Sequence, residues 1–147
     1  MKDTLLVLVV DDTPANLEVV EAILSDTGFE VAIATDGERA IKQATISQPD
    51  LILLDVMMPI MDGFETCRCL KRSPATSEIP VIFMTALSDT TDKVKGFNLG
   101  AVDYITKPFQ EAELLARVTT HLKLRNLHQT LERQVEQRTA DLQTALQ

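Results

Sequence analysis

The feature that most constrains the fold is a fivefold alternation of short apolar runs with amphipathic stretches over about the first 123 residues. Three runs are almost continuously hydrophobic, as expected of strands that are buried on both faces of a parallel sheet. These are Leu5 to Val10, Leu51 to Leu54 and Val81 to Met84. A run at Phe29 to Ile33 alternates more and predicts an edge strand, and a weaker fifth run covers Ala101 to Ile105.

The stretches between these runs carry the marks of helices. The first begins at Thr13-Pro14 and stops before Gly28. The fourth begins near residue 89 and is predicted to turn Val94 and Phe97 inward. Strand and helix thus alternate five times, which predicts right-handed crossovers and a five-stranded parallel sheet with helices on both faces. The expected fold is α/β, doubly wound and flavodoxin-like, with strand order 2-1-3-4-5 and an extended C-terminal helix.

The last helix is predicted to be longer than the sheet. From Glu111 to Gln147 the sequence has 37 residues without Gly or Pro, which as an α-helix would span about 55 Å. We therefore expect residues 124–147 to protrude. Their apolar residues recur at 11-residue steps and form a narrow stripe that a single helix cannot bury. Pairing of two chains in a coiled coil is predicted, and a frayed, solvated tail is the alternative. The stripe consists of Leu124, Leu127, Leu131, Val135, Leu142 and Leu146.

Charge and composition narrow the class of function. The 14 Lys+Arg residues against 22 Asp+Glu residues give a net charge of −8. Such a surface repels phosphate backbones and anionic lipid, so we expect no nucleic-acid and no membrane partner. No apolar run approaches the roughly 18 residues that cross a bilayer, and no signal peptide is recognisable, so a cytoplasmic protein is expected. Cys67 and Cys69 lie two apart in a predicted helix, which predicts one packed and one partly exposed free thiol.

Polar side chains follow four of the five predicted strands, at the edge where an open parallel sheet binds its ligands. Asp11 and Asp12 follow the first strand, Asp55 the third, Thr85 the fourth and Lys107 the fifth. Three neighbouring carboxylates repel one another unless a cation offsets their charge, and Mg²⁺ suits such oxygen ligands. Asp55, beyond the central strand, is the expected nucleophile toward a phosphoryl group, forming an acyl phosphate, with Lys107 balancing the charge.

The sequence around these residues resembles the receiver domain of the two-component response regulator family. The resemblance covers about residues 4–123, so we expect a receiver domain over residues 1–123 and a protruding helical extension over 124–147. The matching motifs are Val9-Val10-Asp11-Asp12, Asp50 to Pro59 with Met61-Asp62-Gly63, Pro80 to Ala86, and Gly100 to Phe109.

The resemblance implies a role for each residue at the sheet edge. Asp55 would accept a phosphoryl group from a sensor histidine kinase or a phosphotransfer protein. Mg²⁺ would be held by Asp11, Asp12 and Asp55 together with the backbone carbonyl of Met57. Lys107 would contact the phosphate.

The resemblance also implies a switch. Thr85 would move its hydroxyl onto the phosphate and Tyr104 would turn inward behind it. The surface formed by the fourth helix, the fifth strand and the fifth helix would change as a result. A cis peptide bond between Lys107 and Pro108 is implied as well.

Two further positions bear on how long a phosphoryl group would persist. Met57 and Leu87 stand where the family tunes this lifetime, and neither side chain can orient a water molecule, so slow self-dephosphorylation is expected. Self-directed phosphotransfer and autodephosphorylation are the only reactions expected, so the chain is not predicted to be an enzyme. His121 and His128, seven residues apart on the long helix, are predicted to be surface or interface residues.

The segment Leu131 to Leu142 resembles the coiled-coil linker that joins receivers to sensor, histidine kinase or cyclase modules. The expected function is a phosphorylation-controlled switch that acts through a homodimer of the C-terminal helix or through an output partner. The alternatives are a phosphorylation-independent dimerisation or interaction module and an N-terminal regulatory fragment of a longer kinase or cyclase. A metal-dependent phosphohydrolase is disfavoured because Val56-Met57, rather than the usual x-Asp, follows Asp55.

Overall fold

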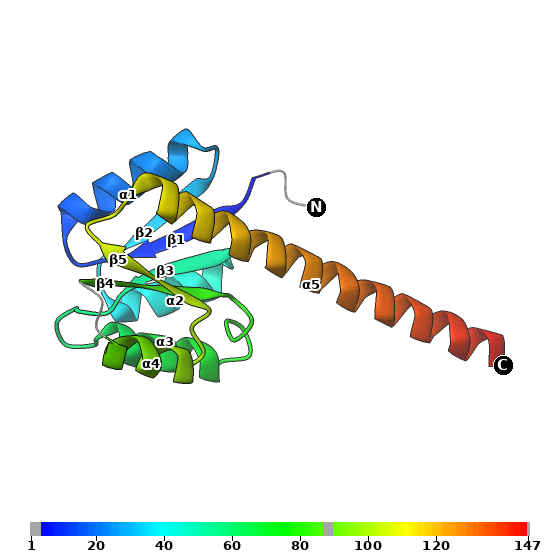
Figure 1. Ribbon diagram of the computed structural model, residues 1–147. Coiled ribbons are helices and arrows are strands. Elements are labelled where there is room, and N and C mark those ends of the chain that lie inside the picture. The colour runs from blue at the N-terminus through cyan, green and yellow to red at the C-terminus, as the bar shows by residue number, and fades with distance from the viewer. Residues whose placement is uncertain (1–3, 87–89, 147) are drawn as a thin grey trace.

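A computed structural model describes residues 4–86 and 90–146, with side chains omitted for 90–92 and 143–146. The described residues form one parallel sheet of five strands in the order β2-β1-β3-β4-β5 (Figure 1). The predicted α/β, doubly wound, flavodoxin-like fold is confirmed, with β3 at the centre and β2 at an edge. The strands are β1 (Leu6–Val10), β2 (Glu30–Ala34), β3 (Leu51–Asp55), β4 (Val81–Ala86) and β5 (Asp103–Lys107).

Helices cover both faces of the sheet and bury it. All five residues of β3 are buried, because each face of this central strand packs against a helical layer. One layer consists of α1 (Pro14–Asp26) and the beginning of α5 (Glu111–Leu146), as Figure 1 shows. The other consists of α2 (Gly37–Ser47), α3 (Gly63–Arg72) and α4 (Thr90–Asn98).

The start of α3 fixes the loop that follows the central strand. Asp62 is the N-cap of this helix, and its Oδ1 accepts a hydrogen bond from the backbone N–H of Glu65 at 2.9 Å. The next residue, Gly63, approaches the backbone at the end of β3 so closely that a Cβ atom would collide with the Asp55 carbonyl. Farther along α3, Cys67 is buried and Cys69 partly exposed, and both are free thiols as predicted.

The packing of α4 differs from the prediction. Val94 and Phe97 are 52% and 47% exposed, so the expected inward orientation is wrong. The helix instead packs through Gly96, where an added Cβ atom would stand 2.8 Å from a ring carbon of Phe83. The glycine lets the helix backbone approach the sheet, and this orientation turns the larger apolar side chains outward.

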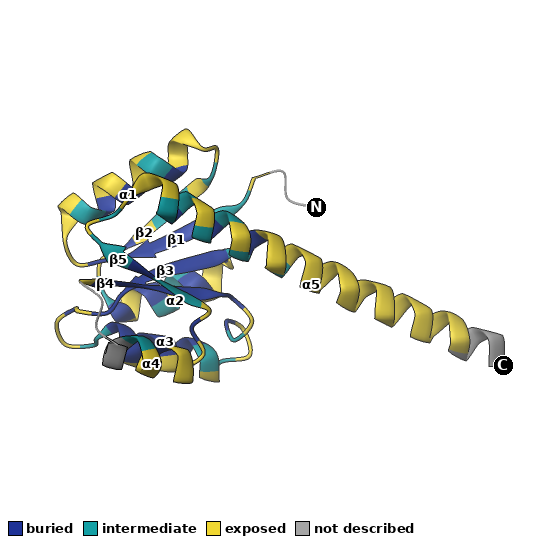
Figure 2. Ribbon diagram, viewed as in Figure 1, coloured by how far each residue is buried: buried dark blue, intermediate teal, exposed yellow. Residues whose placement is uncertain are grey.

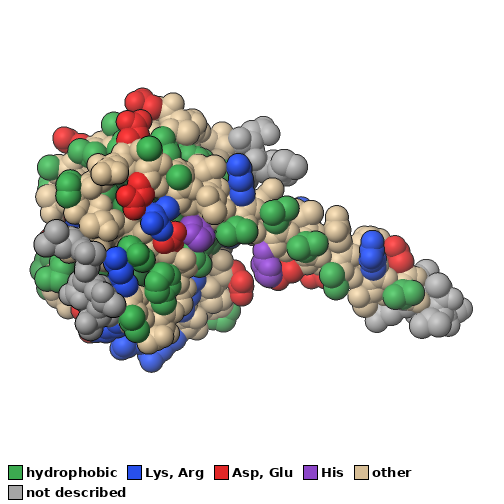
Figure 3. Space-filling view, viewed as in Figure 1, with side chains coloured by type: hydrophobic (Ala, Val, Ile, Leu, Met, Phe, Trp, Pro, Cys, Tyr) green, Lys and Arg blue, Asp and Glu red, His purple; other side chains and the backbone are tan. Residues whose placement is uncertain are grey.

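The C-terminal helix α5 continues without a break for 36 residues. Leu114, Val118 and Leu122 in its first turns are buried against the sheet. Residues 126–142 are exposed and extend away from the domain (Figure 2), which confirms the extended helix. Hydrophobic side chains follow one side of this extension, as Figure 3 shows. The exposed members of the predicted stripe are Leu124, Leu127, Leu131, Val135 and Leu142.

Candidate functional site

Three carboxylates meet at the carboxyl end of the sheet. Asp11 and Asp12 follow β1, and Asp55 ends the adjacent strand β3. One carboxylate oxygen of each lies within 4.8 Å of the others. Asp55 is 3% exposed and Asp11 is fully buried, whereas Asp12 faces solvent. The strand register thus brings together the acidic residues predicted from the sequence.

Lys107 reaches these carboxylates from the end of β5. Its Nζ donates hydrogen bonds to Asp11 Oδ2 at 3.1 Å and to Asp55 Oδ1 at 3.0 Å. The Lys107–Pro108 peptide bond is cis, as the resemblance implied. One ammonium group facing three carboxylates leaves an excess of negative charge, and such a set of hard oxygen donors fits a divalent cation such as Mg²⁺.

Burial and charge shift the ionisation of the central groups. Desolvation by burial raises the pKa of the Asp55 carboxyl from 3.8 to about 6; the hydrogen bond from Lys107 opposes this rise, and the nearby charge of Asp11 adds to it. Burial lowers the pKa of the Lys107 ammonium, but its contacts with Asp55 and Asp11 outweigh that effect and raise the pKa overall. The lysine therefore stays charged, while Asp55 is held in an environment that disfavours its ionised form.

Two further predicted residues lie beside Asp55. Thr85 is buried near the end of β4, the strand adjacent to β3. The backbone N–H of Met57 donates to Asp55 Oδ1 at 3.4 Å, so the Met57 peptide borders the carboxylate, while the Met57 side chain is exposed. Leu87, the second position predicted to affect the phosphoryl lifetime, lies outside the described residues.

Tyr104 lies farther from the carboxylates, between β5 and α4. Its ring packs edge-on against Phe97 with 6.0 Å between the ring centroids. The Nζ atom of Lys93 lies 4.0 Å from the centre of the same ring. The predicted switch residue is thus half-buried against α4, where it contacts the partly exposed Phe97 ring.

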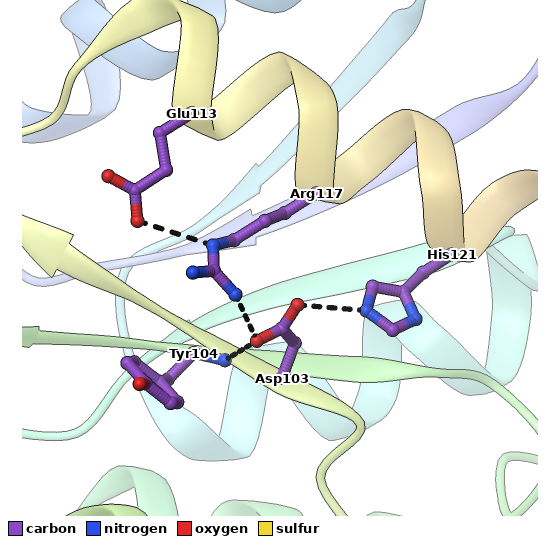
Figure 4. Close-up of polar contacts among 5 residues, drawn as sticks. All are labelled: Asp103, Tyr104, Glu113, Arg117 and His121. Carbon is purple, nitrogen blue, oxygen red and sulfur yellow. Dashed lines mark hydrogen bonds and ion pairs between the residues drawn. The ribbon is translucent and has the colours of Figure 1, made fainter.

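A polar cluster next to Tyr104 was not anticipated from the sequence. Asp103 Oδ1 accepts from Arg117 Nη1 at 2.5 Å, and Asp103 Oδ2 lies 3.0 Å from His121 Nε2 (Figure 4). Arg117 also donates a hydrogen bond from Nε to Glu113 Oε1 at 3.2 Å. The sequence signal for this cluster is the spacing of Glu113, Arg117 and His121, which places them on one side of α5.

The two predicted surface or interface histidines lie in different environments. The His121 side chain is 15% exposed and is covered within its own chain, which differs from the predicted surface position. Its ring faces Asp103 because α5 lies directly against β5 at this point. His128 is exposed on the extension, as predicted, and its Nε2 lies 2.9 Å from Glu132 Oε1.

The fold and the acidic site together define a signalling receiver. Residues 7–119 match the family model of the response regulator receiver domain, and the chain belongs to this family, the receivers of two-component systems. It is 45% identical over 117 residues to the DNA-binding dual master transcriptional regulator RpaA of Synechocystis sp., over 80% of this chain and 48% of RpaA. It is 49% identical over 112 residues to response regulator PleD of Caulobacter vibrioides, over 76% of this chain and 25% of PleD. The chain thus spans half or less of the length of these relatives.

A solved structure supports the assignment of the acidic site. The receiver domain of sensor histidine kinase PA1611 from Pseudomonas aeruginosa PAO1 is 31% identical, with a TM-score of 0.76 over 82% of this chain and 98% of that one. That structure has a magnesium ion coordinated in its active site cleft. Receiver domains bind Mg²⁺ at an acidic cluster, and the described residues of this chain contain such a cluster.

The long helix α5 is too polar for a membrane span. In the parts of the chain that the structure describes, no helix combines the length and the apolar character needed to cross a bilayer.

Proposed function

We propose that this receiver domain is a switch controlled by phosphorylation of Asp55, with a sensor histidine kinase or a phosphotransfer protein as the phosphoryl donor. The observation that carries the proposal is the pairing of a nearly buried Asp55 carboxylate with Lys107 at 3.0 Å, beside two further carboxylates. This environment leaves Asp55 with little stabilisation from water and keeps a cation ready to bind phosphoryl oxygens.

The transfer follows from the positions of these groups. One carboxylate oxygen of Asp55 attacks the phosphorus atom, the P–N bond to the donor histidine breaks, and its electron pair stays on the imidazole nitrogen. The product is an acyl phosphate on Asp55. Asp11, Asp12, Asp55 and the backbone carbonyl of Met57 would hold Mg²⁺, which would supply positive charge to neutralise the phosphoryl oxygens. Lys107 donates to a phosphoryl oxygen from the opposite side.

The switch relies on Thr85 and Tyr104. The Thr85 hydroxyl donates to a phosphoryl oxygen, which draws the end of β4 toward Asp55 and opens space that the Tyr104 ring enters. Tyr104 adjoins Asp103, whose carboxylate holds Arg117 and His121 of α5. A movement of the tyrosine therefore reaches the α4-β5-α5 surface through directly bonded neighbours.

The output of the switch is dimerisation through the extension or binding of an output partner. Positions 117, 121, 124, 128 and 131 are separated alternately by four and three residues, so the Asp103 cluster and the apolar stripe lie on the same side of α5. The exposed stripe supports a coiled-coil homodimer, because an isolated helix cannot bury it. A change beside Tyr104 then alters the stability or register of that dimer.

The proposal also limits the class of partner and the reactions of this chain. Protein partners, rather than nucleic acid or membrane, suit a net charge of −8. The chemistry is limited to self-directed phosphotransfer and autodephosphorylation, in the cytoplasm where kinases and their donors act. The chain spans 48% of RpaA and 25% of PleD, so we also keep the role of a regulatory part within a longer signalling protein as a second candidate.

Intact mass after incubation with acetyl phosphate and Mg²⁺ tests the proposal. The wild type is expected to gain one phosphoryl group, and the gain should disappear in Asp55→Asn and in the presence of EDTA. Asp62→Asn, which changes an N-cap rather than the acidic site, is the matched control and should still gain the group. A folded wild type that gains nothing from acetyl phosphate or from a phosphorylated phosphotransfer protein would favour a phosphorylation-independent interaction module.

A further inference from the structure

A cavity lies at the end of the sheet opposite the acidic site. Its volume is about 570 Å³, and it occupies the corner where α5 leaves the domain. Its apolar wall comes from Leu5 before β1, Phe29 before β2 and Leu122 of α5. Figure 1 shows that this corner is the end where the strands begin, whereas the acidic site lies where they end. The cavity is thus separate from the phosphorylation site.

The polar part of the cavity is cationic, although the chain as a whole is acidic. Lys123, Arg125 and Arg133 line it, against the single carboxylate of Asp50. That carboxylate is engaged, because its Oδ2 accepts a hydrogen bond from the backbone N–H of Leu6 at 2.8 Å. Glu78, outside the lining, also acts on Arg125 through its charge, so three cations stand against two carboxylates and the cavity keeps a local excess of positive charge.

Arg125 lines the cavity and is bonded to the domain. Its Nη1 donates to the backbone carbonyl of Asp50 at 3.0 Å, which ties α5 to the start of β3. Its Nε is buried, and the described residues offer it no hydrogen-bond acceptor. Because Nε is inaccessible and Nη1 bonds to Asp50, Arg125 contributes to the cavity through the charge of a guanidinium that is already attached to the wall, which favours an anionic group.

We propose that this cavity binds a small organic anion that carries one phosphate or carboxylate group on an apolar body. The anionic group would lie against Lys123, Arg125 and Arg133, and the apolar body against Leu5, Phe29 and Leu122. A volume of about 570 Å³ falls within the range of about 300 to 1,000 Å³ that is usual for small-molecule sites.

The position of the cavity gives such a ligand a regulatory effect. Its walls come both from the domain and from the turn of α5 that carries Arg133, so a bound anion would hold the exposed part of the helix against the domain. Leu122, Asn126, Gln129 and Arg133 are four, three and four residues apart and form the side of α5 that faces the cavity. The apolar stripe lies on the other side, so ligand binding and helix pairing can occur together.

Titration of the full chain with anilinonaphthalene sulfonate, an aromatic anion, tests the site by fluorescence. We expect saturable binding of one probe molecule, and binding about tenfold weaker in Arg133→Glu because that variant places a negative charge at the rim. Lys42→Glu carries the same change of charge at an exposed position of α2 outside the cavity, and its affinity should stay within about twofold of wild type. Octanoate and octyl phosphate should displace the probe, and their relative potency distinguishes a carboxylate from a phosphate ligand.

Three results would overturn the proposal. The first is binding that does not saturate at one site. The second is equal affinity in wild type and Arg133→Glu, with both proteins folded by circular dichroism. The third is loss of binding in Leu131→Asp but not in Arg133→Glu, which would place the probe on the apolar stripe.

Discussion

Lys107 Nζ lies 3.0 Å from Asp55 Oδ1 and 3.1 Å from Asp11 Oδ2, although β4 separates the strand of the lysine from that of Asp55. The ammonium thus holds two buried carboxylates together at the carboxyl end of the sheet.

Lys107→Met should destabilise the domain by about 3 kcal/mol at pH 7, because it leaves buried carboxylates without their cation. Urea unfolding measures the change, and Mg²⁺ should restore part of the loss by replacing the missing positive charge. Lys42→Met, on an exposed face of α2, is the control and should change the free energy of unfolding by less than about 0.5 kcal/mol. Equal stability of the two variants would contradict the role of the lysine.

Asp55→Asn should stabilise the metal-free domain at neutral pH. The pKa of Asp55 is raised from 3.8 to about 6 in the folded state, so its ionised form opposes folding. Well below its ordinary pKa of 3.8, at about pH 2 to 3, the carboxyl is protonated in both states and the two proteins should be equally stable. The advantage of the asparagine should grow between about pH 4 and pH 6 and level off above the folded-state pKa of about 6, at on the order of 1 to 3 kcal/mol.

Thermal unfolding between about pH 3 and pH 8 without metal measures this difference in stability and whether it grows with pH. Asp12→Asn removes an exposed carboxylate at the same edge and should show a much smaller advantage. An advantage of Asp55→Asn that shrinks as the pH rises would show that the raised pKa has been assigned in the wrong direction.

Ile60→Gly should stabilise the protein. Ile60 is fully exposed and has a φ of 70°, a left-handed conformation that is strained for a β-branched residue. Glycine removes this strain at the cost of its own chain entropy, so a gain of up to about 1 kcal/mol is expected by chemical unfolding. Ile46→Gly, in the exposed last turn of α2, should instead lose about 1 kcal/mol. If both substitutions changed the free energy of unfolding in the same direction, strain at Ile60 would be ruled out.

The phosphoryl group on Asp55 should be lost slowly. The Met57 side chain is exposed beside the site and cannot orient a water molecule for attack. We expect a half-life of many minutes in Mg²⁺, followed by intact mass after removal of the donor, and a shorter one in Met57→Asn, whose amide can hold a water molecule. A half-life of seconds in the wild type would contradict this prediction.

Leu131→Asp should abolish self-association. The substitution places a charge in the exposed apolar stripe of the extension, where a paired helix would bury it. Sedimentation velocity over a range of concentrations should show a monomer for Leu131→Asp and a dimer for the wild type. Gln129→Asp adds the same charge on the other side of α5 and should leave the dimer intact. Dimers of equal stability in both variants would exclude the stripe as the interface.

The acidic site was predictable because it depends on topology alone. The carboxyl ends of parallel strands share one edge of a sheet, so Asp11, Asp55 and Lys107 converge once the strand order is known. The contact of Asp103 with His121 was missed because it depends on the distance between β5 and α5, which no local pattern encodes. The cavity at the base of α5 was missed for the same reason, since it depends on the direction in which that helix leaves the domain.

The error at Val94 and Phe97 has a different cause. Apolar side chains at helical spacing are expected to face a core, and that rule ignores how closely the backbone can approach. Gly96 allows contact with the Phe83 ring, and this contact determines which side of α4 faces the sheet.

The single helix α5 connects the core of the domain directly to the exposed extension. Its first turns are anchored in the core by Leu114, Val118 and Leu122, while residues 126–142 are exposed. From residue 126 to the end of α5 the helix is about 30 Å long. A tilt of about 10° at the anchor would therefore move the far end by about 5 Å. If the proposed switch tilts α5 beside β5, a small change at the domain would thus become a displacement about the size of a helical turn at the far end.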